Sequence, residues 1–189
     1  MDMIGEHSIP ASRERVWEAL NDPDILRRCI PGCQTVEKTS PTELTASAIA
    51  KVGPVKATFK GVVTLSDLDP PNGYTISGQG KGGAAGFAKG SAAVRLARRD
   101  GLTILSYTVK ASVGGKLAQV GGRLIDSAAK KMADDFFAAL GAALAEETGA
   151  EEIGAAPRPA EPAKRGISPL VWASALIALA ALSLWFYTR

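Results

Sequence analysis

The spacing of apolar residues changes twice along the 189-residue chain. Residues 3–9 alternate between apolar and polar or small side chains, and alternation returns from about residue 34 to residue 111. From residue 117 onward, apolar residues instead recur every three or four positions. Alternation predicts half-buried β-strands, and the longer spacing predicts a helix with one apolar face. The pattern therefore predicts a β-rich region followed by one long amphipathic helix.

Two capping signals predict two short helices directly after the first strand. Ser12 is placed to cap a helix over residues 13–20, because its side chain can accept a hydrogen bond from a free backbone N–H. Asp22-Pro23 starts a second helix with proline at its first position, and Pro31-Gly32 closes it.

Turn signals divide residues 34–111 into short strands of an antiparallel meander. About six strands are predicted, in addition to the first. The turn signals are Pro41, Gly53-Pro54, Pro70-Pro71-Asn72-Gly73, Gly82-Gly83 and Asp100-Gly101.

The long helix must bury its apolar stripe, and the curved sheet is the surface available for it. The predicted fold is therefore α+β, a helix-grip arrangement in which a curved antiparallel sheet of about seven strands wraps around the long C-terminal helix. Gly121 and Gly122 each cost a helix about 1 kcal/mol relative to alanine, which indicates either close packing or a hinge, and we favour close packing. The stripe comprises Leu117, Val120, Leu124, Ala128, Met132, Phe136, Leu140 and Leu144.

A second helix, over residues 167–187, is predicted to cross a membrane. No charged residue occurs from position 166 to position 188, and about 20 residues at about 1.5 Å each match the hydrocarbon core of a bilayer. Trp172 near one end and Trp185 and Tyr187 near the other are predicted to lie at the membrane interfaces. Residues 149–166, rich in Ala, Pro and Glu, form the predicted linker, and residues 1–148 form the globular domain.

Charge and the N-terminus predict where the domain lies. The first residues have neither the basic nor the apolar region of a signal peptide. Lys164 and Arg165 precede the predicted span and only Arg189 follows it, which favours a cytosolic N-terminal domain on the cytoplasmic membrane. The net charge of +3 is spread along the chain, so no nucleic-acid partner is predicted.

Several motifs of the domain resemble those of the family of the carbon monoxide dehydrogenase G protein, an accessory family within the START-like (SRPBCC) superfamily. The resemblance covers about residues 2–147, and it implies an accessory protein that helps bring a molybdenum hydroxylase of the carbon monoxide dehydrogenase type to the cytoplasmic membrane. The motifs, in order, are Pro10-Ala-Ser-Arg-Glu-Arg-Val-Trp17, Leu20-Asn-Asp-Pro23, Ile30-Pro-Gly-Cys33, Gly80-Lys-Gly-Gly-Ala-Ala-Gly-Phe-Ala-Lys-Gly-Ser91, and Gly115-Lys-Leu-Ala-Gln-Val-Gly121 with Phe136-Phe137.

The residue types needed for catalysis or metal binding are scarce. Cys29, Cys33 and His7 are too few for a closed zinc site, so no metal is predicted. His7 is the single histidine and is interpreted as structural, so no catalytic residue is assigned. The string from Gly78 to Gly83 matches a dinucleotide fingerprint, but a strand is predicted after it where that motif needs a helix.

The inward positions of the predicted strands hold unusually small residues, among them Ala46, Ala48, Gly61 and Gly78. Small residues either leave volume between sheet and helix or let the helix pack closer, and we favour the first, which predicts an apolar cavity. Its predicted occupant is a respiratory quinone or another isoprenoid lipid, which would couple carbon monoxide oxidation to electron transfer. A pure recruitment adaptor and a lipid- or polyketide-modifying enzyme are the alternatives. The predicted wall comprises Trp17, Phe59, Val63, Phe87 as a plug at the mouth, Tyr107, Leu117, Val120, Leu124 and Ala128.

Overall fold

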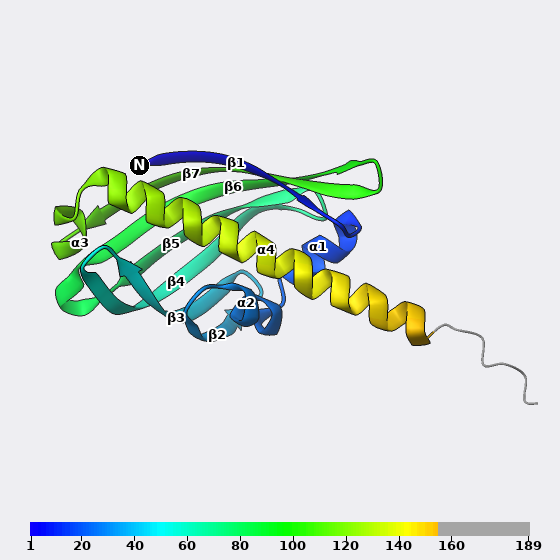
Figure 1. Ribbon diagram of the computed structural model, residues 1–189, viewed down its shortest axis with the longest axis horizontal. Helices are drawn as coiled ribbons and strands as arrows, with labels where there is room; N and C mark the ends of the chain where they lie inside the picture. The colour runs from blue at the N-terminus through cyan, green and yellow to red at the C-terminus, as the bar shows by residue number, and fades with distance from the viewer. Residues whose placement is uncertain (155–189) are drawn as a thin grey trace, which may run out of the picture. The chain divides into compact units, whose positions relative to one another are not determined.

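A computed structural model describes residues 1–154 of the chain, and side chains as far as residue 146. The predicted order of elements is confirmed: one strand, two short helices, six further strands and a long helix. The seven strands form one antiparallel sheet in the order β1-β7-β6-β5-β4-β3-β2, and the sheet curves around α4 (Figure 1). The elements are β1 (Asp2–Ile9), α1 (Arg13–Leu20), α2 (Pro23–Cys29), β2 (Cys33–Ser40), β3 (Glu43–Val52), β4 (Val55–Asp69), β5 (Gly73–Lys81), the 3₁₀ turn η1 (Gly83–Ala85), β6 (Phe87–Arg99), β7 (Leu102–Gly114), α3 (Lys116–Gln119) and α4 (Gly122–Gly154).

The two predicted helix caps are present. The Ser12 hydroxyl accepts a hydrogen bond from the backbone N–H of Arg15 at 3.2 Å. The Asp22 carboxylate accepts from the N–H groups of Asp24 and Ile25 at 2.8 and 3.3 Å, ahead of Pro23 at the first helical position. These short-range signals fix where the chain leaves β1 and folds back beneath the sheet.

The meander gives the domain two different ends. At the closed end lie α1 and the turns that join β2 to β3, β4 to β5 and β6 to β7. At the open end lie the β3–β4 turn, the β5–β6 connection with η1, and α3 (Figure 1).

Large buried side chains concentrate toward the closed end. Ile9, Leu105 and Leu140 are each at most 1% exposed, and they belong to one cluster that joins β1, β7 and α4. Two long-range hydrogen bonds tie this end together. The Thr103 hydroxyl donates to the carbonyl of Ala11 at 2.7 Å, and the Arg13 guanidinium donates to the side-chain oxygen of Asn72 at 2.7 Å.

The long helix does not begin where its sequence pattern predicts. The chain first forms the short α3 and then turns at Gly121, whose φ of +94° is a conformation that favours glycine. A Cβ atom at Gly121 or Gly122 would meet nothing within 4 Å, so the interpretation of this pair as a close-packing point is wrong. The glycines permit a change of direction.

The predicted apolar stripe is also incomplete. Leu124 and Met132 are 49% and 39% exposed, whereas Leu140 and Leu144 further along α4 are buried. The physical reason is that α1 and α2 cover α4 only toward the closed end, so large side chains near the start of α4 have no second layer to pack against.

The predicted membrane-spanning helix at 167–187, with Trp172, Trp185 and Tyr187, lies outside the described residues. Within the described part of the chain, no helix combines the length and the apolar character needed to cross a membrane. Helix α4 continues to Gly154, so it includes the first residues of the segment predicted as a linker.

Candidate functional site: an apolar cavity on the concave face

A cavity of about 260 Å³ lies on the concave face of the sheet, near α1 and α2. Every lining side chain except that of Tyr74 is purely hydrocarbon, so the cavity offers almost no hydrogen bonds. Such a lining favours an apolar ligand held by area burial. The lining residues are Leu20, Leu26, Ile30, Val36, Leu44, Ala46, Val63, Leu65, Tyr74, Ile76, Val94, Leu105, Phe136 and Phe137.

Tyr74 is the single polar side chain of this lining. It is 5% exposed, and its ring meets that of Trp17 edge to face, with 5.3 Å between the ring centres. Burial raises the pKa of Tyr74 far above its ordinary value, so the phenol stays neutral. Its hydroxyl has no hydrogen-bond partner among the residues that the structure describes. A bound molecule with one carbonyl or hydroxyl group could satisfy it.

A shallower groove of about 360 Å³ continues along the concave face toward the open end. Alanine and glycine predominate in its floor. Phe59 contributes the one aromatic ring, and this ring lies against Gly82 of the β5–β6 connection. The lining residues are Ala46, Ala48, Phe59, Gly61, Val62, Val63, Gly78, Gln79, Gly80, Ala88, Lys89, Gly90 and Ala111.

Two glycines of the groove lie too close to a neighbouring strand to carry a side chain. A Cβ atom at Gly61 would lie 2.7 Å from the carbonyl oxygen of Gln79, and one at Gly90 would lie 2.6 Å from the carbonyl oxygen of Lys110. Distances this short are not tolerated, so no other residue fits without a backbone shift. The small residues therefore allow this close approach and leave the groove empty.

Cavity and groove form one continuous apolar path. Ala46 and Val63, on neighbouring strands β3 and β4, line both of them. The path runs from the Tyr74 hydroxyl near the closed end to the small-residue floor near the open end.

The structure places two of the predicted wall residues on this path. Val63 lines both parts, and Phe59 lines the groove. Trp17 lies behind Tyr74 and contacts its ring. Ala128 is half-buried on α4.

Phe87 does not plug the mouth of the cavity. It begins β6 with 45% of its surface exposed, and alternation along β6 puts it on the same face as Lys89 and Ser91, away from α4. There its ring lies over Gly114 of β7, its register partner. The prediction failed because a residue inside a glycine-rich run gives no indication of the face on which the strand resumes.

The remaining predicted wall residues lie beside the path. Leu117 is buried on α3, Val120 is half-buried at its end, and Leu124 lies near the β3–β4 turn, within reach of Gly53. Tyr107 is buried on β7 and stacks on Phe137, with ring centres 5.6 Å apart. These residues support the path without lining it.

His7 belongs to the same aromatic cluster as Tyr107. Its ring stacks on Phe137 with centres 4.2 Å apart, and its Nε2 lies 3.9 Å from a carboxylate oxygen of Asp134 on α4. Partial burial lowers the pKa of His7 and outweighs the opposing effect of Asp134, while Lys130 adds to the lowering. The histidine thus packs β1 against α4 outside the lining of the cavity.

The two cysteines are free thiols, with Cys29 buried and Cys33 half-buried. Burial raises the pKa of both thiols, which disfavours the reactive thiolate. Among the described residues, no group of three or more His, Cys, Asp or Glu side chains could hold a metal ion. The glycine-rich string from Gly78 ends strand β5 and is followed by η1 and β6, so the helix that a dinucleotide site requires is not formed there.

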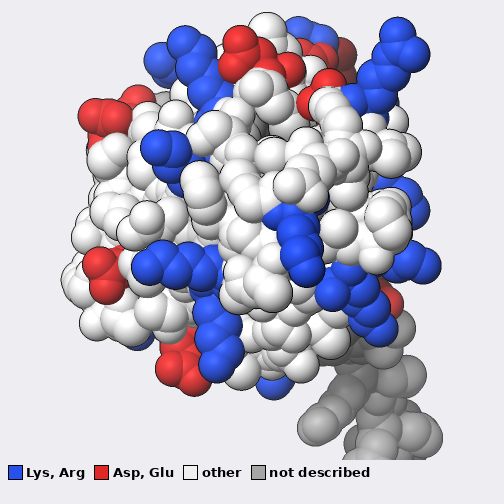
Figure 2. Space-filling view, turned by 90° about the vertical axis from the view of Figure 1, so that its left-hand side faces the viewer, with Lys and Arg blue, Asp and Glu red and all other residues white. Residues whose placement is uncertain are grey.

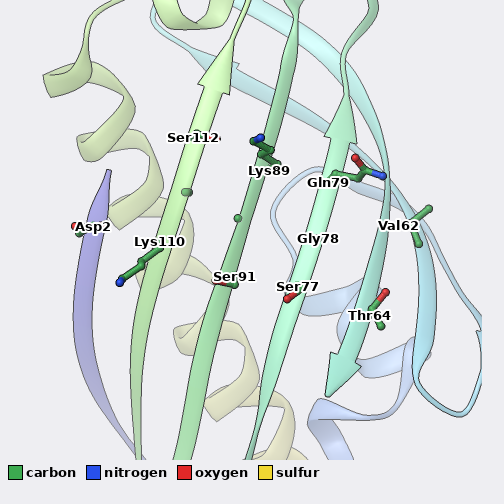
Figure 3. Close-up of a pocket in the computed structure, with 12 residues that line it drawn as sticks. Asp2, Val62, Thr64, Ser77, Gly78, Gln79, Lys89, Ser91, Lys110 and Ser112 are labelled. Atoms are coloured by element: carbon green, nitrogen blue, oxygen red, sulfur yellow. The ribbon is translucent and has the colours of Figure 1, made fainter. Parts of the chain in front are cut away.

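A larger hollow, of about 660 Å³, lies on the opposite face of the sheet, with α4 behind the strands (Figure 3). Exposed polar side chains predominate in its lining, among them Gln79, Lys89, Ser91 and Lys110. It is the outer surface of a strongly bent sheet. The smaller inner cavity is better enclosed by buried residues and is the candidate site.

Most residues of the inner cavity were not predicted from the sequence. The small inward residues drew attention to the open end, whereas the cavity lies where large inward side chains such as Leu44, Leu65 and Ile76 meet α1 and α2. Their alternation in the strands was the available signal. Tyr74 follows the Pro-Pro-Asn-Gly turn directly, and its position gave no sign that it faces a cavity.

Comparison with solved structures places this architecture in a known class. The chain resembles a START superfamily protein from Mycobacterium smegmatis (TM-score 0.59, 13% identity, covering 77% of this chain and 97% of that one). It also resembles the Zhui aromatase/cyclase from Streptomyces sp. R1128 (TM-score 0.56, 14% identity, 78% and 95% covered). At such low identity these likenesses define the fold, which is the START-like helix-grip fold.

The family is narrower. Residues 5–145 match the CoxG family, named for the G component of carbon monoxide dehydrogenase, and the chain belongs to that family. A conserved protein from Geobacillus kaustophilus is 31% identical, with a TM-score of 0.73, covering 77% of this chain and 96% of that one. No curated protein matches the chain at a significant level. Family and fold together indicate an accessory protein that binds a ligand.

Proposed function

We propose that this protein carries a respiratory quinone for a molybdenum hydroxylase of the carbon monoxide dehydrogenase type and recruits that enzyme to the cytoplasmic membrane. The observation that carries the proposal is the apolar path with one free hydroxyl at its inner end. A quinone has a planar ring with carbonyl oxygens and a long hydrocarbon chain, and the path offers one polar contact followed by hydrocarbon walls.

The dimensions of the path favour a ligand of this shape. A cavity of about 260 Å³ is near the lower end of the roughly 300–1,000 Å³ usual for ligand pockets. It suits a headgroup, while an attached chain could follow the groove past Ala46 and Val63 toward the open end. The neutral Tyr74 hydroxyl could donate a hydrogen bond to a quinone carbonyl, which would offset the cost of leaving that carbonyl unpaired in an apolar site.

The membrane part of the proposal rests on the sequence of residues 167–187. A single span there would hold the domain beside the pool of quinone, and it would deliver a docked oxidoreductase to the same surface. Cytosolic placement of the domain follows from the charges that flank the span. Binding and delivery require no chemistry from the protein itself, so we propose no catalytic residue.

The direct test is to purify the full-length protein from membranes, extract it with organic solvent and identify bound molecules by mass spectrometry. We expect an isoprenoid quinone in near-stoichiometric amount. A variant Ala46→Phe, which fills the junction of cavity and groove, should lose it. The matched control is Thr45→Phe, which adds the same ring on the other face of β3 and should keep it. Wild-type protein that carries no isoprenoid molecule would sink the carrier proposal.

Recruitment is tested separately, so that carrier and adaptor can be told apart. Deleting residues 167–189 should release the partner enzyme into the soluble fraction, whereas Ala46→Phe should leave it on the membrane and abolish respiration-linked oxidation. If Ala46→Phe supports normal oxidation, the protein is an adaptor alone.

A further inference from the structure

The open end of the domain is strongly basic. Within residues 1–5, 49–62, 77–91 and 110–126, which form its turns and adjoining strand ends, two acids, Asp2 and Asp126, accompany eight cations. Figure 2 views the molecule from the side of α3, and there Lys and Arg side chains are spread over a largely uncharged surface, with Asp and Glu nearer its margins. The cations, called the basic ring below, are Lys51, Lys56, Lys60, Lys81, Lys89, Lys110, Lys116 and Arg123.

All members of the basic ring are exposed, and none forms an ion pair with another described residue. Elsewhere on the domain, paired and unpaired cations both occur. Lys38, Arg95, Arg98 and Arg99 form no ion pair with a described residue. The cations that are paired with a carboxylate are Arg13, Arg15, Arg27, Lys130 and Lys131. The charge of the basic ring is therefore available to a partner.

Large apolar side chains are exposed at the same end. Leu124 is 49% exposed, Phe87 45% and Ile49 38%, and they belong to the start of α4, the start of β6 and the end of β3. Leu124 lies near the β3–β4 turn, whereas Phe87 and Ile49 lie on the outer face of the sheet. Large apolar side chains that are exposed together at one end of a domain mark a surface that a partner covers.

The residue types in the basic ring distinguish between a protein partner and a lipid surface. Protein interfaces are enriched in arginine and depleted of lysine, whereas seven of these eight cations are lysine. Lysine stems lie along apolar surface while their ammonium groups reach a headgroup layer. Anionic lipids attract each such group by about 1 kcal/mol when it lies near the membrane surface. Flexible lysines around apolar tips fit a lipid surface.

We propose that the open end docks on the surface of an anionic lipid bilayer. The lysines of the basic ring contact headgroups, and Phe87, Leu124 and Ile49 enter the interface, which brings the open end of the groove to the membrane surface. A ligand then passes between membrane and groove without crossing water. This path rests on the proposed function, but the docking itself depends only on the charges and the exposed apolar residues.

The test uses the full-length chain reconstituted into vesicles. Hydrogen exchange is followed at residues 50–56, 82–87 and 115–124 in vesicles of phosphatidylglycerol with phosphatidylcholine and in phosphatidylcholine alone. We expect slower exchange of these segments with the anionic lipid. The protection should vanish at about 1 M salt, where the Debye length falls to about 3 Å.

A matched pair of double variants makes the test specific. Lys51→Glu with Lys56→Glu reverses two charges at the β3–β4 turn of the open end. Arg98→Glu with Arg99→Glu reverses two charges at the β6–β7 turn of the closed end. We expect the first double variant to lower the affinity of the open end for anionic vesicles about 30-fold or more. The second should leave that affinity unchanged. The proposal is overturned if hydrogen exchange of the open-end segments is equally fast with both lipid mixtures. It is also overturned if both double variants weaken docking to the same extent.

The outcome is separable from that of the proposed function. If the chain stays on the vesicles at high salt, the membrane-spanning helix proposed for residues 167–187 is supported. If the chain is released at high salt, that helix does not anchor it. Flotation of phosphatidylglycerol-containing vesicles at low salt then measures docking alone, and protein that does not float with them overturns the docking proposal as well.

Discussion

The two ends of this domain are built from the same meander by opposite means. At the closed end, large side chains such as Leu105 and Leu140 are buried between the sheet and the helices, and polar side chains bridge distant segments. At the open end, alanine and glycine predominate in the groove, large apolar residues such as Leu124 are exposed, and cations outnumber acids. Stability and access are therefore provided by different ends of one sheet, with the candidate cavity between them.

The most direct test of this difference is to truncate one large apolar side chain at each end. Leu105→Ala, at 1% exposure, should cost about 2–5 kcal/mol of unfolding free energy through lost burial and a residual cavity. Leu124→Ala, at 49% exposure, should change it by no more than about 0.5 kcal/mol. Urea denaturation of both variants measures this. Similar losses would show that the open end contributes to the core.

A second test asks whether the glycines of the groove are structural. Gly90→Val should destabilise the domain by about 1–3 kcal/mol, because its Cβ would lie 2.6 Å from the carbonyl oxygen of Lys110 and force the strands apart. Ala93→Val, on the exposed face of the same strand, should be neutral. Thermal unfolding compares the two. A well-folded Gly90→Val protein would mean that the sheet can flatten without cost.

The polar contact of the cavity can be tested without disturbing its shape. Tyr74→Phe removes a hydroxyl with no partner in the described residues, so the fold should lose little stability, but quinone affinity should fall about 3- to 10-fold with the loss of one hydrogen bond. Tyr107→Phe is the control, because Tyr107 is similarly buried and does not line the cavity. Titration with a soluble short-chain quinone gives both affinities. Equal affinities in wild type and Tyr74→Phe would remove Tyr74 from the site.

The smallest effect concerns His7 and pH. Its pKa is lowered in the folded state from 6.5, mainly by burial, so the folded domain binds a proton less readily than the unfolded chain. The stability that His7 contributes is therefore complete above about pH 6.5 and decreases as the pH falls through that value toward its lower folded pKa. The variant His7→Phe keeps the ring stacking. Urea denaturation should show that its unfolding free energy decreases less between pH 7.5 and pH 5.5 than that of the wild type. An identical pH dependence would assign the loss to other groups.

The order of elements could be predicted from local signals, whereas the site could not. Ser12 and Asp22 act within one helical turn, and alternation in the strands is visible in any short window, so caps, strands and meander followed from the sequence. The lining of the cavity depends on where α1 and α2 lie over the sheet. Leu20 and Leu26 meet Leu44 and Leu65 only because of that long-range placement.

The errors have two origins. Leu124 matches the periodicity of the buried residues of α4 but is 49% exposed at the open end, whereas Phe87 follows a glycine-rich run and is out of phase with the buried residues of β6. Periodicity identifies the side of an element on which a residue lies, and it carries no information about whether another element is present there.

Helix α4 also sets a length scale. At about 1.5 Å per residue, the stretch from Gly122 to Glu151 is about 45 Å long, and it begins at the open end. The two ends of this helix are therefore far enough apart that a partner bound at one of them leaves the other accessible.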